Sequence, residues 1–152
     1  MTTPLHGASR NGHITAMRML IEHRAEVDKK DKNGYTPLHL AAWNNHIDAT
    51  KLLIDNGANI DERANGGWTP LHRASYKGDV HMIQLLIDNG ANIYEKSVGG
   101  WTPLCCASHR GHTDAVRLLR ILKLKKILSN WWISSLYHSC IGSILDHHMQ
   151  DI

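Results

Sequence analysis

Histidine and cysteine are the residues of this chain that could bind a metal or act in catalysis. The sequence contains 12 His and 3 Cys, and imidazole and thiolate groups serve as zinc ligands, bases and nucleophiles. Three of the histidines, His6, His39 and His72, recur at intervals of 33 residues. This regular spacing makes them the first candidates for a site, and it is also the first sign of an internal repeat.

A second group of possible metal ligands lies near the C-terminus. Asp146, His147 and His148 are adjacent, and Cys140 or His138 could join them. A structural zinc site usually combines two separately spaced pairs of ligands, and this short cluster lacks the second pair. We therefore expect no metal site.

The adjacent cysteines Cys105 and Cys106 have no identifiable base to activate them, and a buried small apolar side chain is the default interpretation of both. The sequence also lacks the glycine-rich dinucleotide fingerprint, the P-loop, the His-Glu-x-x-His motif and the Gly-x-Ser-x-Gly motif. We expect a protein without enzymatic activity and without a cofactor.

The three recurring histidines belong to a repeated four-residue pattern that contains all 4 prolines of the chain. Thr36 is a good helix N-cap, because its hydroxyl can accept a hydrogen bond from a free amide of the first turn. Pro37 at the first helical position loses no useful hydrogen bond, and the same holds for Thr69 and Pro70. The four copies are Thr3–His6, Thr36–His39, Thr69–His72 and Thr102–Cys105.

A 33-residue period carrying Thr-Pro-Leu-His-x-Ala is the signature of ankyrin repeats, and the chain resembles that family over residues 1–119. The resemblance implies an all-α solenoid of stacked helix-turn-helix repeats with short β-hairpin tips, in which each repeat buries its faces against its neighbours. It also implies that His39 and His72 are structural and hydrogen-bond across the turn and to the next repeat.

The second repeat is closest to the family pattern. We expect its helices to run from Pro37 to about Asn44 and from Ile47 to Asn56, and Asn33 and Gly34 to supply the positive-φ residues of its hairpin tip. The register places the four repeats at 1–30, 31–63, 64–96 and 97–119, the last incomplete, and leaves 120–152 as a non-repeat tail.

Three features depart from the register. Arg24 stands where later repeats have Gly57 and Gly90, and a left-handed conformation costs Arg about 1 kcal/mol or more relative to Gly. We therefore expect the end of this helix to be frayed or reshaped. Asn45 replaces the usual glycine between the helices, and the Asp-Asn-Gly pattern fails to return after Leu119.

The tail allows three interpretations. The first is a poorly ordered extension, or a shifted reading frame appended where a longer array was cut; the collapse of the register within the fourth repeat favours a fragment of a larger protein. The second is a membrane anchor, because Ile127–Leu145 contains no Asp, Glu, Lys or Arg and follows several lysines. Its many serines make this segment more polar than a typical membrane-spanning helix. The third is a capping helix.

The charge balance argues against nucleic acid as the partner, since 17 Lys and Arg face 14 Asp and Glu. Three cysteines, two of them adjacent, form no disulfide framework, and the N-terminus carries no signal segment. We expect an intracellular protein, cytoplasmic or nuclear, and a monomer that does not insert into membranes.

The positions that the repeat leaves free are the candidate binding residues, because partners of the family commonly bind along the tips and the exposed side of the first helices. Aromatic residues and Arg dominate protein–protein hot spots, although Trp68 and Trp101 share a register and can simply stack. We therefore predict a protein-binding adaptor or scaffold. The alternatives are a membrane-tethered adaptor and a truncated fragment or isoform of a larger ankyrin-repeat protein. The candidates are Lys32, Asn33, Tyr35, Asn65, Trp68, Val98 and Trp101 from the tips, and Arg10, Asn11, Trp43, Asn44, Tyr76, Lys77, His109 and Arg110 from the ends of the first helices.

Overall fold

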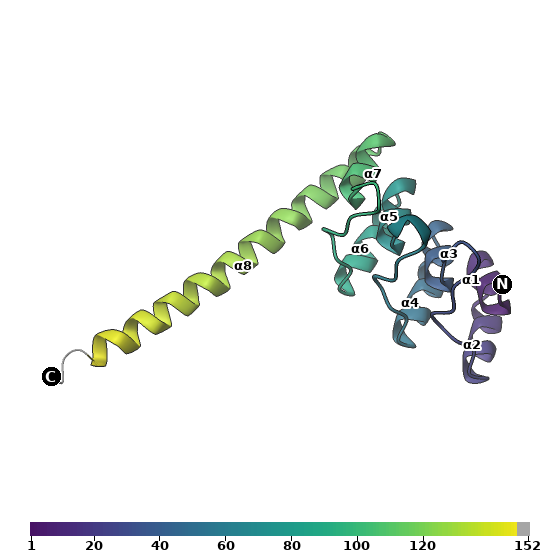
Figure 1. Cartoon of the computed structure of the whole chain (residues 1–152), viewed down its shortest axis with the longest axis horizontal. Coiled ribbons are helices and arrows are strands. Elements are labelled where there is room, and N and C mark those ends of the chain that lie inside the picture. Colours follow the sequence, from purple (N-terminus) through teal and green to yellow (C-terminus); the bar gives the residue numbers. More distant parts are fainter. Residues whose placement is uncertain (149–152) are drawn as a thin grey trace. The chain divides into compact units, whose positions relative to one another are not determined.

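The computed structural model describes the backbone of residues 1–148 and the side chains of residues 1–130. This described part consists of helices and turns and contains no β-strand (Figure 1). The chain divides into two compact units, residues 1–119 and 120–152. The helices are α1 (Pro4–Asn11), α2 (Ile14–Glu22), α3 (Pro37–Trp43), α4 (Ile47–Asp55), α5 (Pro70–Lys77), α6 (Val80–Asp88), α7 (Pro103–His109) and α8 (Thr113–His148), with a short 3-10 turn η1 (Asn65–Gly67).

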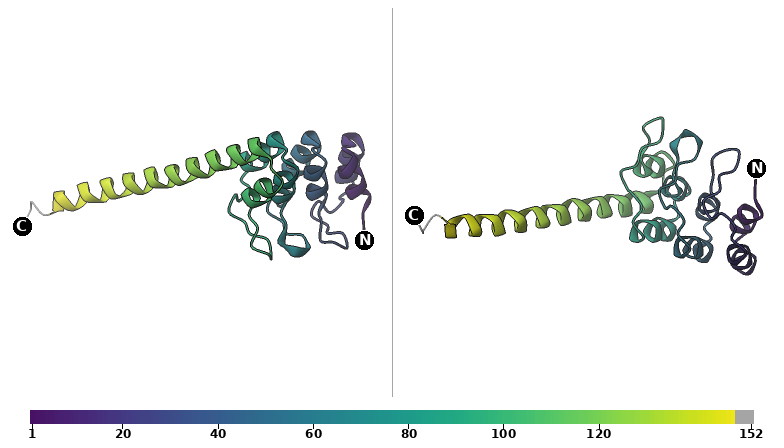
Figure 2. Two further views of the ribbon diagram at one scale, coloured as in Figure 1. Left: turned by 90° about the horizontal axis from the view of Figure 1, so that it is seen from above. Right: turned by 60° about the horizontal axis from the view of Figure 1, so that its bottom comes forward.

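The first unit is a stack of helix pairs. The first helices of the repeats, α1, α3, α5 and α7, pack side by side, and each of the first three also packs on the helix that follows it (Figure 1). The second helices α2, α4 and α6 form the other layer, and the tips project from one side of the stack (Figure 2). The predicted all-α solenoid is confirmed.

The core of the stack repeats with the sequence. Leu38 and Leu71, which follow the prolines, are fully buried, and so are Ala41 and Ala74 one helical turn later. These small side chains let neighbouring first helices approach closely. Burial of one line of residues from every repeat is what holds a solenoid together, because no repeat can cover its own apolar faces.

Helix α8 is longer than the second helices of the other repeats. Leu119 of α8 is fully buried, so the beginning of α8 supplies the second helix of the fourth repeat. Helix α4 ends at Asp55, before Asn56 and Gly57, whereas nothing comparable follows Leu119. Because this stop signal is missing, α8 continues to His148.

Among the described residues, no helix is both long enough and apolar enough to cross a membrane. Most of the candidate span, Ile127–Leu145, lies outside the residues whose side chains are described.

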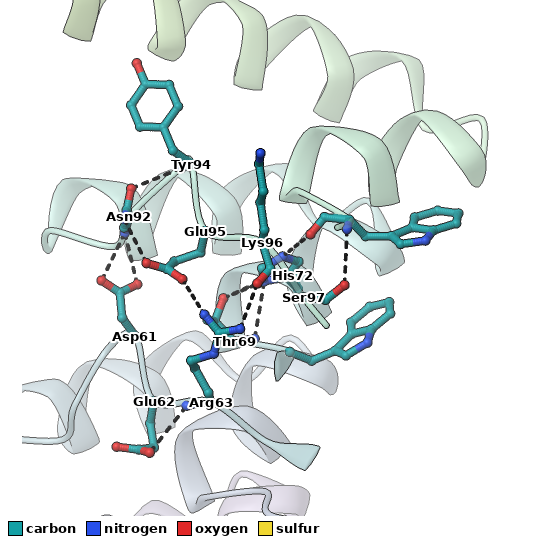
Figure 3. Close-up of polar contacts among 12 residues, drawn as sticks. Asp61, Glu62, Arg63, Thr69, His72, Asn92, Tyr94, Glu95, Lys96 and Ser97 are labelled. Atoms are coloured by element: carbon teal, nitrogen blue, oxygen red, sulfur yellow. Dashed lines mark hydrogen bonds and ion pairs between the residues drawn. The ribbon is translucent and has the colours of Figure 1, made fainter. Parts of the chain in front are cut away.

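The recurring histidines connect one repeat to the next. In His39, Nδ1 accepts a hydrogen bond from the Thr36 backbone N–H at 3.2 Å, and Nε2 donates to the Trp68 carbonyl of the next repeat at 2.9 Å. His72 makes the same pair of bonds, with the Thr69 N–H and the Trp101 carbonyl (Figure 3). Since a carbonyl oxygen can only accept, Nε2 must carry the proton. Through these bonds each histidine links its own turn to the next repeat.

The tips are tight turns rather than two-stranded hairpins. In the second repeat the Asp31 N–H donates to the Tyr35 carbonyl and the Gly34 N–H donates to the Asp31 carbonyl. Gly34 has a φ of 77°, but Asn33 does not have a positive φ, so the prediction that both residues would adopt it is wrong. The Asp31 carboxylate accepts from the N–H groups of Asn33 and Tyr35 and holds a three-residue loop ending in a left-handed glycine.

The end of α2 also differs from expectation. Arg24 has a φ of 62°, and the Ala25 N–H donates to the Leu20 carbonyl at 2.9 Å. The corresponding bond after α4, from Ala58 to Leu53, measures 3.0 Å. The helix is therefore closed by the same Schellman turn as its neighbours, and the expected fraying is wrong. Packing of the stack holds Arg24 in a conformation that its side chain disfavours.

Replacing Arg24 with glycine is expected to stabilise the protein by about 1 kcal/mol, because glycine adopts the left-handed conformation without steric cost. Urea unfolding monitored by circular dichroism measures the change. The matched control is Gly57→Arg, since an added Cβ at Gly57 meets no atom within 4 Å and the substitution tests backbone strain alone. It should lower the free energy of unfolding by a similar amount. An unchanged or lower stability of Arg24→Gly would contradict the strain.

Stability is expected to fall between pH 6.5 and pH 4 because of His39. Burial lowers the pKa of His39 from 6.5 to about 4, since the charged ring would lose solvation and present an N–H to the Thr36 N–H. The neutral ring is favoured only in the folded state, so its contribution is complete above pH 6.5 and disappears as the pH falls toward 4. The loss amounts to ~3 kcal/mol. Urea titrations across this range measure it. His39→Gln should make the pH dependence less steep without abolishing it, because burial also lowers the pKa of His72. A free energy of unfolding that stays constant in the wild type would refute the assignment.

Candidate protein-interaction surface

The bases of the tips are tied together by charged residues that recur at the repeat interval. Lys30 Nζ lies 2.6 Å from a Glu62 carboxylate oxygen, and one repeat later Arg63 lies 2.9 Å from Glu95. Arg63 also donates to the Lys96 carbonyl at 2.8 Å (Figure 3). These contacts join the base of each tip to the base of the next.

Aromatic side chains of the second and third repeats form one cluster. The rings of Trp43 and Tyr76 stack across the repeat boundary with centroids 5.9 Å apart and planes 24° apart. Trp68 meets Tyr76 edge-on at 5.8 Å. All three side chains are half-buried, so each ring retains area that a partner can cover. Offset stacked and edge-on pairs are the preferred arrangements of aromatic rings.

Arg73 connects this cluster to Tyr35. Its guanidinium carbon lies 4.4 Å from the Tyr35 ring centroid and 4.2 Å from that of Trp43. Both distances fall within the range of cation–π attraction. The sequence analysis missed this residue, although the repeat register contains the signal: the equivalent positions hold Gly7, Leu40 and Cys106, so Arg73 is the charged exception.

Two further cations flank the rings. The Lys77 ammonium lies 5.1 Å from the Trp43 centroid, and the Arg110 guanidinium carbon lies 4.8 Å from that of Tyr76. Both residues are exposed. We call the cluster formed by Tyr35, Trp43, Trp68, Arg73, Tyr76, Lys77 and Arg110 the aromatic surface.

Trp101 lies apart from this cluster. Its ring meets His109 of the same repeat edge-on, with centroids 5.0 Å apart, while Trp68 packs on His72 and Tyr76 of its own repeat. Both tryptophans thus find ring partners within their own repeats. Trp101 is 36% exposed, and its tip neighbour Val98 is 81% exposed.

The remaining predicted residues are exposed, and several use their polar groups within the array. The side-chain amides of Asn11 and Asn44 donate to the carbonyls of Gly7 and Leu40 in their own helices. Between tips, the Asn65 N–H donates to the Asn33 carbonyl, and the Asn65 side chain donates to that of Lys32. The Arg10 carbonyl accepts from His46 at 2.9 Å. Their contribution to binding stays a prediction.

The described residues contain no group of His, Cys, Asp and Glu side chains that could hold a metal ion. The cluster of Asp146, His147 and His148 lies outside the residues whose side chains are described. Burial raises the pKa of the Cys106 thiol to about 11, which suppresses the thiolate that a nucleophile requires.

Two family models match the chain. One, described as ankyrin repeats (3 copies), matches residues 1–64, and the other, described as ankyrin repeats (many copies), matches residues 44–87 and 82–120. The chain belongs to the ankyrin-repeat family. Ankyrin repeats indicate a protein–protein interaction module, and the family is typically non-enzymatic. A search of curated proteins finds no match to the chain.

The interface between the second repeat, which contains Trp43, and the third differs from the other repeat interfaces in the residue that crosses it. At the other interfaces a histidine crosses the boundary: His46 donates to the Arg10 carbonyl, and His112 donates to the Tyr76 carbonyl at 3.0 Å. The equivalent residue of the third repeat is Asp79. One of its carboxylate oxygens is buried without a hydrogen-bond partner among the described residues, and burial raises its pKa.

The residue that faces His46, Asp79 or His112 from the preceding repeat explains why position 79 is not a histidine. A Cβ added to Gly12 would lie 2.7 Å from the His46 ring, and one added to Gly78 would lie closer still to His112. The equivalent residue facing Asp79 is Asn45, which has a Cβ and a φ of 56°. We infer that Asn45 excludes a histidine at position 79 and that the smaller aspartate compensates.

A double-mutant cycle tests this pairing. Asp79→His alone is expected to destabilise the array, because the ring would collide with the Asn45 side chain. Together with Asn45→Gly it should donate to the Trp43 carbonyl and stabilise the array. The expected coupling energy, measured by urea unfolding, is about 1 kcal/mol or more. Additive effects of the two substitutions would show that the residues are independent.

Proposed function

We propose that this protein is an adaptor that binds a protein partner through the aromatic surface. The observation that supports the proposal is the joining of Trp43, Tyr76 and Arg73 from two repeats into one half-buried, stacked cluster. Trp, Tyr and Arg are the residue types most enriched among the side chains that dominate binding energy at protein interfaces.

Preorganisation is the mechanism. The Trp43 ring is held by Tyr76 on the next repeat and by Arg73 and Lys77. A free side chain loses about 0.5–1.5 kcal/mol of conformational freedom when a partner immobilises it. Because these side chains are already ordered by one another, a smaller part of that cost falls on binding.

The test is affinity capture with the full chain, comparing the wild type with Trp43→Leu/Tyr76→Leu by quantitative mass spectrometry. Leucine retains apolar volume at both positions and removes the stacked rings. Proteins that bind through the aromatic surface should be retained by the wild type and depleted at least about tenfold by the double variant, because the loss of one hot-spot residue costs more than 1 kcal/mol. Direct titration of each purified protein against both forms then measures the affinity.

Tyr94→Leu is the matched control, because it removes an exposed aromatic ring that lies outside the aromatic surface. It should capture the same proteins as the wild type. Thermal melts of all three forms show that the variants remain folded. If every captured protein binds the double variant as tightly as the wild type, the aromatic surface is not the binding site.

A further inference from the structure

Acidic residues are absent from the layer of first helices and occur in the layer of second helices and in the loops. None of the first helices α1, α3, α5 and α7 contains an Asp or Glu, whereas they and the residue after α7 carry Arg10, Arg73, Lys77 and Arg110. The acidic residues of the array lie in the second helices, at their ends and in the loops. The array as a whole is nearly neutral, with 13 Lys and Arg against 12 Asp and Glu in residues 1–119. Within residues 1–119 the positive charge therefore belongs to one face rather than to the array as a whole.

The acidic residues of the loops are occupied by contacts within the array. Glu62 pairs with Lys30, and Glu95 pairs with Arg63. The Asp61 carboxylate accepts from the Asn92 N–H of the next repeat at 2.9 Å (Figure 3). By contrast, no ion pair joins Arg73, Lys77 or Arg110 to a carboxylate among the described residues. The charge of Lys77 nevertheless acts on Asp79, where it partly opposes the rise in pKa that burial causes.

Arg73 is the least solvated of these cations. It is half-buried, and its Nε has no hydrogen-bond partner among the described residues. Burial, the largest cause, lowers the pKa of the guanidinium, and the Tyr35 ring hydroxyl only partly opposes this. The side chain still carries its charge at neutral pH, so the array holds a desolvated cation without the anion that normally accompanies one.

The repeat itself does not require this arginine. Leu40, at the equivalent position one repeat earlier, is buried and apolar. The guanidinium carbon lies over the rings of Tyr35 and Trp43, and a guanidinium held against aromatic rings can still donate through its N–H groups. That arrangement suits a carboxylate, which can accept two parallel N–H bonds from Arg.

We propose that the aromatic surface binds an acidic segment of the partner protein, in which carboxylates meet Arg73, Lys77 and Arg110 and apolar side chains cover the rings of Trp43 and Tyr76. This inference rests on the proposed function and adds the chemistry of the partner. A protein segment fits better than nucleic acid, because a polyanion with one charge per nucleotide is matched by a long basic groove. Here three cations and four rings form one cluster on an otherwise neutral array rather than a groove that follows a nucleic-acid backbone.

The test measures fluorescence anisotropy of a fluorescein-labelled random copolymer of glutamate and tyrosine as the full chain is added. Arg73→Leu is the main variant, because leucine occupies the equivalent position at Leu40. It should weaken binding by about tenfold or more, the effect of losing one charge-assisted hydrogen bond. Arg18→Leu removes one exposed positive charge from α2 and should change the affinity by less than about twofold.

Two further measurements keep the proposal open to refutation. If Arg73→Leu does not fold, as judged by circular dichroism, Lys77→Gln/Arg110→Gln changes only exposed side chains and should also weaken binding. The second measurement compares the binding of the glutamate–tyrosine copolymer with that of a lysine–tyrosine copolymer and of single-stranded oligothymidine. Equal or tighter binding of the lysine copolymer overturns the proposal, and tighter binding of oligothymidine assigns the surface to nucleic acid.

The outcomes separate this inference from the proposed function. If Trp43→Leu/Tyr76→Leu loses its captured partners while Arg73→Leu retains them and binds the glutamate copolymer like the wild type, the adaptor function stands and the acidic partner is wrong. If the double variant retains every partner, the aromatic surface itself is wrong, whatever the copolymer does.

Discussion

The hydrogen bond from each Thr-Pro-Leu-His histidine to the carbonyl of the next repeat is the interaction on which the array depends. His39 caps its own helix through Nδ1 and reaches Trp68 through Nε2, so one neutral ring links local helix formation to the stacking of repeats. The carbonyl that it holds belongs to the residue just before the next threonine. In this chain that residue is Tyr35, Trp68 or Trp101. The bond that builds the stack therefore also sets where the aromatic rings of the tips lie.

Departures from the repeat have different physical origins. Arg24 is tolerated: the Schellman turn and its hydrogen bonds form although the left-handed residue is not glycine. Asn45 and Asp79 are a coupled pair, in which the Cβ of Asn45 removes the space that a histidine needs at position 79; one Asp79 carboxylate oxygen is left without a hydrogen-bond partner among the described residues. Arg73 has no compensation within the array; its charge is left with aromatic rings and no carboxylate. Of these departures, Arg73 is the one that lies within the aromatic surface, so it is the one that points toward a partner molecule.

The sequence supplied most of the fold and part of the site. The starts of the first helices were predictable to the residue, because Thr-Pro is a strong local signal, and the predicted ends of α3 and α4 differ from the structure by one residue. The tip was misjudged because the Asn33-Gly34 dipeptide favours a two-residue hairpin, whereas the Asp31 carboxylate selects a three-residue turn. Trp43 and Tyr76 were identified as surface candidates, but their stacking on one another was not.

The amino-acid sequence by itself determined the repeat length, the helix caps, the bridging histidines and the residues left outside the core, because all of these follow from a pattern that recurs every 33 residues. Tertiary structure alone decided which of those outer residues meet. Arg73 and Trp43 are thirty residues apart and belong to different repeats, and their contact depends on how closely two first helices approach. Ala41 and Ala74 are fully buried in these two helices, and their small side chains allow the close approach on which the contact depends.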